Sequence, residues 1–471
     1  MKRPHLPLFL LLLAGLCLTA RADERLPPSV QQALRSAGIP PQAVAIAVQP
    51  LDQTRPALSH RAAAPLNPAS LMKLLTTFAA LETLGPAHTW RTEVLAATLP
   101  QDGVLRGNLY LRGSGDPKLT YDRLWLLLRE LRGRGLRDIR GDLVLDRTAF
   151  APSEHDPAAF DAKPLRPYNV GADALLFNFA SVHLTLIPEN GAVRLLAEPL
   201  PAGLAIVNRL RVTEGRHCGE WRDALTAQFA PGQLILSGDF PRVCGEKRWH
   251  LAGLPNGFLL QGVFARLWNE LGGEFGGGYR EGSVPANALP LAASESPALG
   301  ELVRDINKFS NNVMAQQVFL AMGLKIGAGE TAAAEKALRD WLAHKGLDFP
   351  ELVIDNGSGL SRRQRIAAGS LARLLVAAWA SPVMPEFVAS LPIAALDGTV
   401  RKKYNGNGFA GQAHLKTGSL EGVRGIAGYL LDRQGRRHVV VFMVNHAQAG
   451  NAQPAFDALL EWLWSAPRGD S

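Results

Sequence analysis

Hydrophobic and polar residues follow different periods in different parts of the chain. Near the beginning, residues 28–38 have helical spacing, residues 43–49 form an apolar strand, and residues 58–63 are expected to be its hairpin partner. A mostly apolar segment then begins near residue 70 and reaches Gly85. These patterns predict a strand pair followed by a buried helix.

The pattern changes between about residues 89 and 290. Short β-like runs are separated there by Gly, Pro and polar turns, and they cover residues 91–96, 104–111, 138–145, 183–187, 193–197, 233–236 and 248–251. Two helices are expected among them, at 121–134 and 259–271. We therefore predict a β-rich inserted region at residues 89–290, divided into two subdomains, the second at about 177–250.

Helical spacing returns after residue 297, and the chain ends in strands and one more helix. The expected helices cover 298–306, 311–322, 331–344, 370–378 and 454–464, and the expected strands 413–415, 425–431 and 438–444. Both ends of the chain thus have the same mixed pattern of helices and strands, whereas the region between them is β-rich. This arrangement predicts an α/β (α+β) domain, residues 23–88 and 291–471, whose first and last strands pair in an antiparallel sheet covered by helices.

Residues 1–22 have the pattern of a secretory signal peptide. Lys2 and Arg3 supply the positive end, residues 6–18 are apolar, and Ala20-Arg21-Ala22 resembles a cleavage site. The apolar run is shorter than the roughly 20 residues of a membrane span, although an uncleaved N-terminal anchor is the alternative. We expect a periplasmic or otherwise secreted protein with no transmembrane anchor after processing, able to associate peripherally with a membrane.

The composition limits the classes of partner. With 47% hydrophobic and 20% charged residues, the chain has an ordinary globular composition. Loss of the signal leaves 47 basic and 42 acidic residues, a formal charge of +5, which suits work near an anionic polymer. Basic runs with interleaved aromatic residues are missing from the sequence, so no nucleic-acid partner is expected.

Cysteines and histidines do not have the spacing of a metal site, and neither a metal nor another cofactor is expected. Two cysteines, Cys218 and Cys244, remain after processing. In an exported protein we expect them to form a disulfide, with two buried thiols as the alternative.

Ser70 and Lys73 form the first candidate pair for chemistry. They stand one helical turn apart, so both side chains lie on the same face at a helix start, where backbone N–H groups are unpaired. An amine beside a hydroxyl can serve as its base. A helix cap followed by an exposed lysine is the alternative, but Lys73 falls in an apolar helix, and Ser70 alone among the serines has a lysine three positions later.

Two further motifs follow in the chain. Ser310-Asn311-Asn312 lies between two predicted helices, and Lys416-Thr417-Gly418-Ser419 follows a predicted strand. The order S-x-x-K, S-x-N, K-T-G is the motif set of penicillin-binding proteins and class A β-lactamases. A helix-linking turn and a solvated strand end are the alternatives for the two motifs taken separately.

Each of these residues suits one catalytic role. Ser70 is the expected nucleophile, and Lys73 its base, because burial and a nearby cation such as Lys416 favour the neutral amine. Ser310 can relay the proton to the leaving amine. Asn312 can hold both Lys73 and the substrate amide, since its side chain both donates and accepts.

The K-T-G motif suits recognition of an anion. Lys416, Thr417 and Ser419 would form a cationic pocket rich in hydroxyl groups that binds a carboxylate. Gly418 would let the substrate backbone approach the strand. The backbone N–H groups of Ser70 and Ser419 would stabilise an oxyanion.

Over nearly all of the mature length, the chain resembles the D-alanyl-D-alanine carboxypeptidase/endopeptidase family, class C low-molecular-mass penicillin-binding proteins of the penicillin-binding protein 4 type, peptidase family S13. That family carries a large insertion between its first two motifs, and 237 positions separate Lys73 from Ser310 here. Residues 113–117, 355–362 and 396–399 also resemble the family. Asn311 replaces the Asp of β-lactamases, and Asn356 stands in a stretch that often carries Asp-Gly.

The resemblance implies a β-lactamase/transpeptidase-like fold and a serine DD-peptidase. Such an enzyme cleaves D-Ala-D-Ala termini or D-alanyl cross-links of peptidoglycan stem peptides through an acyl-enzyme, and β-lactam antibiotics inhibit it covalently. It also implies that Arg362 lies near the cleft, and that Asp116 and Tyr121 help to bind the free amine of the peptide's diamino acid. For Asp116, a turn-forming residue before Pro117 is the alternative.

Three other functions fit the sequence less well. A secreted β-lactamase of class A type needs a Glu four positions before an Asn, and that spacing does not occur in the sequence. A catalytically silent peptidoglycan-binding protein would not need all four of Ser70, Lys73, Ser310 and Lys416. A Ser-His-Asp hydrolase of the G-x-S-x-G type is disfavoured because the sequence lacks that motif.

Overall fold

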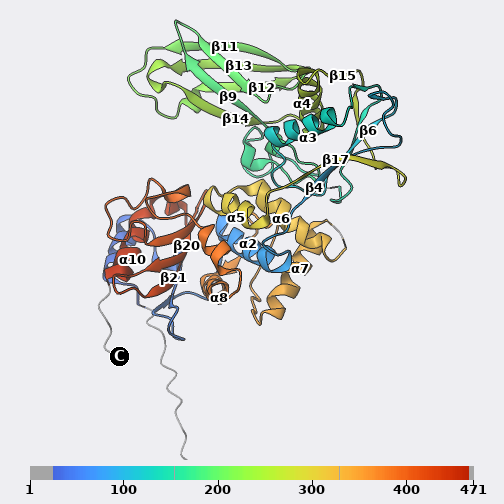
Figure 1. Ribbon diagram of the computed structural model, residues 1–471. Helices are drawn as coiled ribbons and strands as arrows, with labels where there is room; N and C mark the ends of the chain where they lie inside the picture. The colour runs from blue at the N-terminus through green and yellow to red at the C-terminus, as the bar shows by residue number, and fades with distance from the viewer. Residues whose placement is uncertain (1–24, 153, 328, 466–471) are drawn as a thin grey trace, which may run out of the picture.

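The structure is a computed structural model that describes residues 25–152, 154–327 and 329–465. The expected signal peptide, residues 1–22, lies outside the described residues. Figure 1 shows two parts, a helix-covered sheet built from both ends of the chain and the β-rich inserted region beside it. Within the described ranges, no helix is both long and apolar enough to cross a membrane.

The sheet of the first part joins the two ends of the chain, as predicted. Its strand order is β19-β20-β21-β1-β2, and every pairing is antiparallel. Ile46 of β1 stands opposite Phe442 of β21. The bounds are β1 Val44–Pro50, β2 Leu58–His60, β19 Ala413–Leu420, β20 Val423–Leu431 and β21 Arg437–Asn445. The predicted fold class, an antiparallel sheet covered by helices, is therefore confirmed.

Helices cover both faces of this sheet. Alternate side chains of a strand point to opposite faces, so Ala47 and Val441 join one core while Val48 and Val440 join the other. One face packs against α1 (Pro28–Ser36) and α10 (Gln453–Ser465). The other packs against α8 (Ala368–Trp379) and shares a core with α2 (Met72–Thr83), α5 (Leu299–Lys308), α6 (Asn312–Leu324), α7 (Thr331–His344) and α9 (Met384–Ala389).

The inserted region has its own hydrophobic core, formed by buried residues between Val94 and Ala292. It contains a five-stranded sheet, β16-β8-β6-β4-β17, and smaller sheets that include β10-β9-β14 and β11-β13-β12. The strand bounds are β4 Arg91–Ala96, β6 Leu109–Arg112, β8 Leu143–Asp146, β9 Ser181–Pro188, β10 Val193–Glu198, β11 Ala205–Thr213, β12 Leu225–Ala230, β13 Gln233–Pro241, β14 Lys247–Ala252, β16 Tyr279–Glu281 and β17 Leu289–Glu295. Helices α3 (Tyr121–Gly133) and α4 (Asn256–Glu270) match the two expected helices.

Some strands of the inserted region differ from the prediction. The expected runs 104–111 and 138–145 are each divided in two, because β5 (Val104–Leu105) and β7 (Asp138–Ile139) pair in a separate small sheet. Strands β11 and β12 were not expected from the sequence, and most of their residues are exposed or half-buried. β12 forms a local antiparallel hairpin with β13, whereas β11 pairs with β13 in parallel and so depends on contacts between separated segments.

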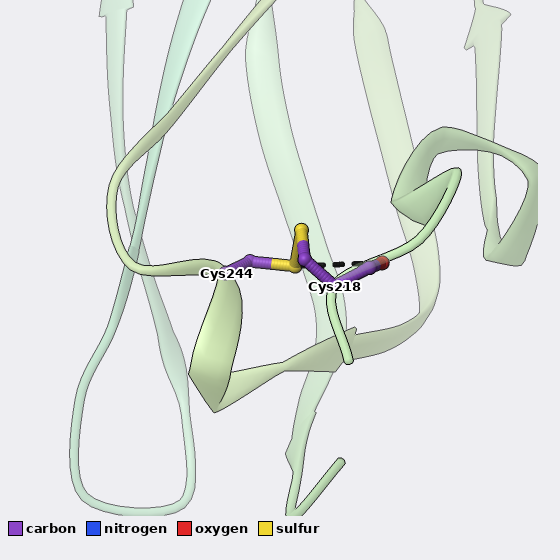
Figure 2. Close-up of a disulfide and its surroundings, with 2 residues drawn as sticks. All are labelled: Cys218 and Cys244. Atoms are coloured by element: carbon purple, nitrogen blue, oxygen red, sulfur yellow. Dashed lines mark hydrogen bonds between the residues drawn. A yellow bond between two sulfur atoms is a disulfide. The ribbon is translucent and has the colours of Figure 1, made fainter. Parts of the chain in front are cut away.

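Cys218 and Cys244 form a disulfide within the inserted region, with their Cα atoms 4.8 Å apart (Figure 2). Cys244 ends the short helix that follows β13, and Cys218 lies in the loop after β11. The bond therefore closes a 26-residue separation around β12 and β13. A cross-link over such a loop stabilises mainly by restricting the unfolded chain.

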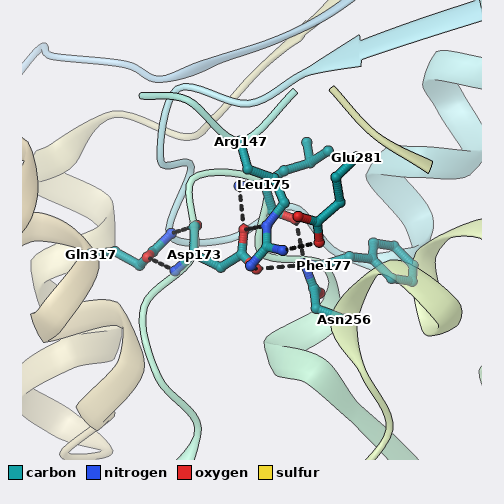
Figure 3. Close-up of polar contacts among 7 residues, drawn as sticks. All are labelled: Arg147, Asp173, Leu175, Phe177, Asn256, Glu281 and Gln317. Atoms are coloured by element: carbon teal, nitrogen blue, oxygen red, sulfur yellow. Dashed lines mark hydrogen bonds and ion pairs between the residues drawn. The ribbon is translucent and has the colours of Figure 1, made fainter. Parts of the chain in front are cut away.

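A polar cluster joins the inserted region to the helix α6 (Figure 3). Arg147 binds Asp173 through two hydrogen bonds of 2.6 and 3.0 Å and also contacts Glu281. Asn256 donates to the same carboxylate at 3.1 Å. From α6, the fully buried Gln317 accepts from the backbone N–H of Asp173 and donates to its carbonyl, both at 2.9 Å. One helix side chain thus satisfies both backbone groups of a residue in the insertion.

Replacement of Gln317 by leucine tests this junction. Leucine has a similar volume but leaves the buried N–H of Asp173 without a partner, while the Asp173 carbonyl keeps its bond from the N–H of Leu176. Q317L should therefore lower the free energy of unfolding by about 1–3 kcal/mol. Thermal and urea unfolding measure the loss. The half-buried neighbour Gln316 provides the matched control, since Q316L should change stability by less than about 0.5 kcal/mol. Equal stability of Q317L and the wild type would contradict the role of Gln317.

Candidate active site

Ser70 lies in a one-turn 3₁₀ helix, Ala69–Leu71, directly before α2. This differs slightly from the predicted α-helix start, because Ala69 has a positive φ of 47° and turns the chain sharply. Asn67 holds the turn: its side chain accepts from the N–H of Ala69 at 2.9 Å and donates to the carbonyl of Ser361 at 2.8 Å. Ser70 remains half-exposed at the surface of this turn.

Lys73 is fully buried in the first turn of α2, and its Nζ contacts three oxygens. Ser70 Oγ lies 3.0 Å away, Asn312 Oδ1 lies 2.7 Å away, and the carbonyl of Ser358 is the third partner. The amide and carbonyl oxygens can only accept. A neutral lysine has two N–H groups, so both must serve these two oxygens and the lone pair then points at Ser70. The arrangement directs the base at the hydroxyl.

Ser310 and Lys416 form the second half of the cluster. Ser310 sits between α5 and α6 with φ of 57°, and Asn311 caps α6 by accepting from the N–H of Met314 at 3.1 Å. Lys416 Nζ donates to Ser310 Oγ at 2.9 Å and to the carbonyl of Thr417 at 2.7 Å. The three motifs, far apart in the chain, therefore meet through the two lysine side chains.

Both lysines are shifted toward their neutral forms. Burial, and secondarily the charge of Lys416, lowers the pKa of Lys73 well below its ordinary value. Burial lowers the pKa of Lys416 to about 7. Burial removes water from both ammonium groups, and a charge on Lys416 further disfavours the protonated form of Lys73.

The K-T-G motif lies within a strand rather than after one, so the expected strand end at residue 415 is wrong. Strand β19 continues to Leu420 because β20 pairs with its whole length, with Gly418 opposite Gly425. A Cβ on Gly418 would lie 2.6 Å from the carbonyl of Pro68. The absence of a side chain therefore lets the strand that also carries Thr417 and the exposed Ser419 pack directly on the turn that carries Ser70.

Two carbonyl groups complete the cluster and were not predicted. Besides the Ser358 carbonyl on Lys73, the carbonyl of Tyr168 in the inserted region accepts from Asn312 Nδ2 at 3.0 Å. Gly359, with φ of 86°, packs its backbone on Ala69, where a Cβ would lie 2.0 Å from the carbonyl. The stretch 355–362 had stood out in the sequence, but a backbone carbonyl has no residue signature that could have revealed its role.

Arg362 bridges the loop after β19 and the inserted region. Its guanidinium donates to the carbonyl of Glu421 at 2.8 Å and stacks 4.9 Å from the ring centre of Phe160 in the inserted region. Phe160 packs in a small apolar cluster that includes Ala69 and Leu420. Arg362 also lines a cavity of about 590 Å³ between the insertion and α6. The predicted position of Arg362 near an active-site cleft stays a prediction.

Asp116 and Tyr121 are not brought to the Ser70 cluster by any described contact. Asp116 is buried at 2% exposure, and burial raises its pKa to about 6. Its backbone carbonyl faces Gln317 at 3.4 Å. Tyr121 begins α3 and packs against the core of the inserted region. Their role in binding a substrate amine stays a prediction. Among the described residues, no cluster of three or more His, Cys, Asp or Glu could hold a metal ion.

Comparison with known proteins gives a consistent relationship. The chain is 30% identical over 417 residues to the D-alanyl-D-alanine carboxypeptidase of Actinomadura sp. (strain R39), covering 82% of this chain and 74% of the relative. It is 25% identical over 413 residues to the D-alanyl-D-alanine carboxypeptidase DacB of Haemophilus influenzae, covering 82% and 81%.

The fold also matches a solved structure. The crystal structure of penicillin binding protein 4 (dacB) from Haemophilus influenzae superposes with a TM-score of 0.77 at 22% identity, covering 92% of this chain and 99% of that one. A second structure of that protein contains a novel β-lactam. The family model for the D-Ala-D-Ala carboxypeptidase 3 (S13) family matches residues 27–464. The chain therefore belongs to the D-Ala-D-Ala carboxypeptidase 3 (S13) family.

Proposed function

We propose that the protein is a serine DD-peptidase that forms an acyl-enzyme on Ser70. The main support is the orientation of the Lys73 amine. Its Nζ lies 3.0 Å from Ser70 Oγ, while two oxygens that can only accept take the two hydrogens of the neutral amine. A base aimed at a half-exposed hydroxyl is the arrangement that acyl transfer needs. Family membership as a D-Ala-D-Ala carboxypeptidase supports peptidoglycan stem peptides as the substrate class.

In the acylation step, neutral Lys73 takes the proton of Ser70 as Oγ attacks the carbonyl of the penultimate D-alanine. The C–N bond then breaks, and Ser310 gives its proton to the leaving amine while the buried Lys416, 2.9 Å away, restores it. A water molecule then attacks the ester carbonyl and gives a proton through Ser310 to the neutral Lys416. The ester C–O bond breaks as Lys73 returns its proton to Ser70 Oγ, which releases the acyl product and restores both lysines. Asn312 keeps Lys73 in place throughout, since it is itself held by the Tyr168 carbonyl.

The substrate would be held at both ends of the scissile bond. Thr417, Ser419 and Lys416 bind the C-terminal carboxylate, and the N–H groups of Ser70 and Ser419 stabilise the oxyanion. The rest of the peptide would pass near Arg362, and its free amine would be bound by Asp116 and Tyr121. β-Lactams, which carry a carboxylate beside a reactive amide, would acylate the same serine, and the β-lactam complex of the Haemophilus influenzae protein supports this.

The same proposal covers location and bond preference. Residues 1–22 would direct the protein out of the cytoplasm to the peptidoglycan, and the mature chain would work in the periplasm or outside the cell. The leaving group could be a terminal D-alanine or the amine side of a D-alanyl cross-link. A terminal D-alanine presents a carboxylate next to the broken bond. A cross-link presents one there if its diamino acid carries a carboxylate beside the linking amine, and the carboxylate pocket would then accept either substrate.

Ser70→Ala should abolish covalent labelling by a fluorescent penicillin, because the attacking oxygen is gone. Ser310→Ala should still label, but more slowly by about 100-fold, since it removes only a proton relay. Gel fluorescence after a time course measures both. Thermal unfolding checks that each variant is folded. Labelling of folded S70A would show that another residue is the nucleophile.

The purified protein should release D-alanine from a diacyl-D-Ala-D-Ala peptide, with no release by S70A. Enzymatic detection of free D-alanine measures this reaction. Digestion of cross-linked muropeptides, followed by chromatography and mass analysis, then separates carboxypeptidase from endopeptidase activity. Release of neither D-alanine nor cross-linked halves by the folded wild type would contradict the proposal.

The plot of acylation rate against pH should be bell-shaped. It should rise as pH passes the lowered pKa of Lys73, because only the neutral amine accepts a proton, and fall as Lys416 loses its proton around its pKa of about 7. Stopped-flow acylation across pH measures both limbs. In K416R the guanidinium keeps its proton, so it cannot restore the proton of Ser310: acylation should be slower than in the wild type at every pH, and the alkaline limb should disappear. A rate that still rises until about pH 10 would mean that Lys73 has an ordinary pKa.

A further inference from the structure

Thr399 contacts the proposed carboxylate pocket from a different segment of the chain. Its Oγ1 lies 2.8 Å from Oγ1 of Thr417, and either hydroxyl could donate. A hydroxyl has a single proton to donate. If Thr417 donates to Thr399, it has no proton for an anion. Donation from Thr417 to a carboxylate therefore requires Thr399 to be the donor in the bond between the two threonines.

An ion pair holds the segment that carries Thr399. Lys308, buried at 3% exposure, donates to Asp397 Oδ2 at 2.6 Å and to the carbonyl of Leu391 at 2.9 Å. Asp397 Oδ1 in turn accepts from the N–H of Ile393 at 2.7 Å. Burial alone would raise the pKa of Asp397, but the hydrogen bonds from Lys308 and Ile393 outweigh it and lower that pKa. Both carboxylate oxygens of Asp397 are therefore hydrogen-bonded, and these bonds fix the loop that precedes Thr399.

The same segment packs on the end of α5. Gly398 has φ of 57°, and a Cβ there would lie 2.6 Å from the carbonyl of Lys308. Lys308 stands two positions before Ser310 in the chain. The turn that carries Ser310, the loop that carries Thr399 and the strand that carries Thr417 are therefore in direct contact. Thr399 has little freedom to move away from Thr417.

We propose that Thr399 is a substrate-positioning residue: its hydroxyl donates to Thr417 and so turns the Thr417 proton toward the C-terminal carboxylate of the substrate. This inference rests on the proposed function and extends it, because it names a residue that sets the preference for a free carboxylate beside the scissile bond. Thr399 acts through Thr417, so its effect requires the Thr417 hydroxyl.

A double-mutant cycle tests this role. Thr399→Val keeps the shape and removes the hydroxyl, Thr399→Ser keeps the hydroxyl, and Thr417→Val removes its partner. On diacyl-D-Ala-D-Ala peptide, T399V should lower kcat/KM about tenfold, mostly through KM, because the carboxylate is already bound in the ground state. T399S should stay within about twofold of the wild type. T399V/T417V should be no worse than T417V alone.

The outcomes separate this inference from the function on which it rests. An active wild type with unchanged T399V, or losses that multiply in the double variant, would overturn the role of Thr399 and leave the proposed function intact. A folded wild type that hydrolyses no D-alanyl peptide would overturn the proposed function itself. If T399V does not fold, as judged by thermal unfolding, Thr399→Ala replaces it in the same cycle with the same expectations.

Discussion

The burial of the Lys73 ammonium group is the constraint on which the rest of the site depends. A buried lysine amine must find protein partners in place of water: here Asn312 of α6 and the carbonyl of Ser358 accept its hydrogens, and the hydroxyl of Ser70 faces its lone pair. Each partner belongs to a different segment, so the lysine can be satisfied only when all of them are in place. The same burial that demands these contacts also makes Lys73 a usable base.

Close backbone packing is what allows so many segments to converge. Gly418 and Gly359 both approach the turn that carries Ser70, and any side chain at either position would overlap its carbonyl groups. The positive φ of Ser310 interrupts the helix between α5 and α6, and its hydroxyl accepts a hydrogen bond from Lys416 at this break. A strained, tightly packed cluster of this kind is stable only because two large hydrophobic cores hold the helices and the sheet around it.

The inserted region does more than border the cleft. It supplies the Tyr168 carbonyl that fixes the amide of Asn312, and Asp173 anchors it to the same helix through Gln317. Helix α6 therefore carries a residue of the S-x-N motif near its beginning and the attachment point of the insertion about one and a half turns later. A displacement of the insertion relative to α6 would move the Tyr168 carbonyl that holds Asn312, and Asn312 in turn contacts Lys73. The polar cluster of Figure 3 is therefore connected to the site through α6.

The sequence by itself determined the antiparallel sheet formed from both ends of the chain, most helices, and the three motifs with their expected chemistry. Its hydrophobic periods and the residue types of Ser70, Lys73 and Lys416 are local properties, which a single chain displays. The tertiary structure alone decided the extension of β19 through the K-T-G motif, the parallel pairing of β11 with β13, and the roles of the Ser358 and Tyr168 carbonyls. The K-T-G residues extend a local hairpin, but Lys416, Thr417 and Ser419 are polar and so show no apolar strand pattern. The β11–β13 pairing and the two carbonyl contacts join segments that are separated in the chain, and backbone groups are the same in every residue, so no local pattern marks them.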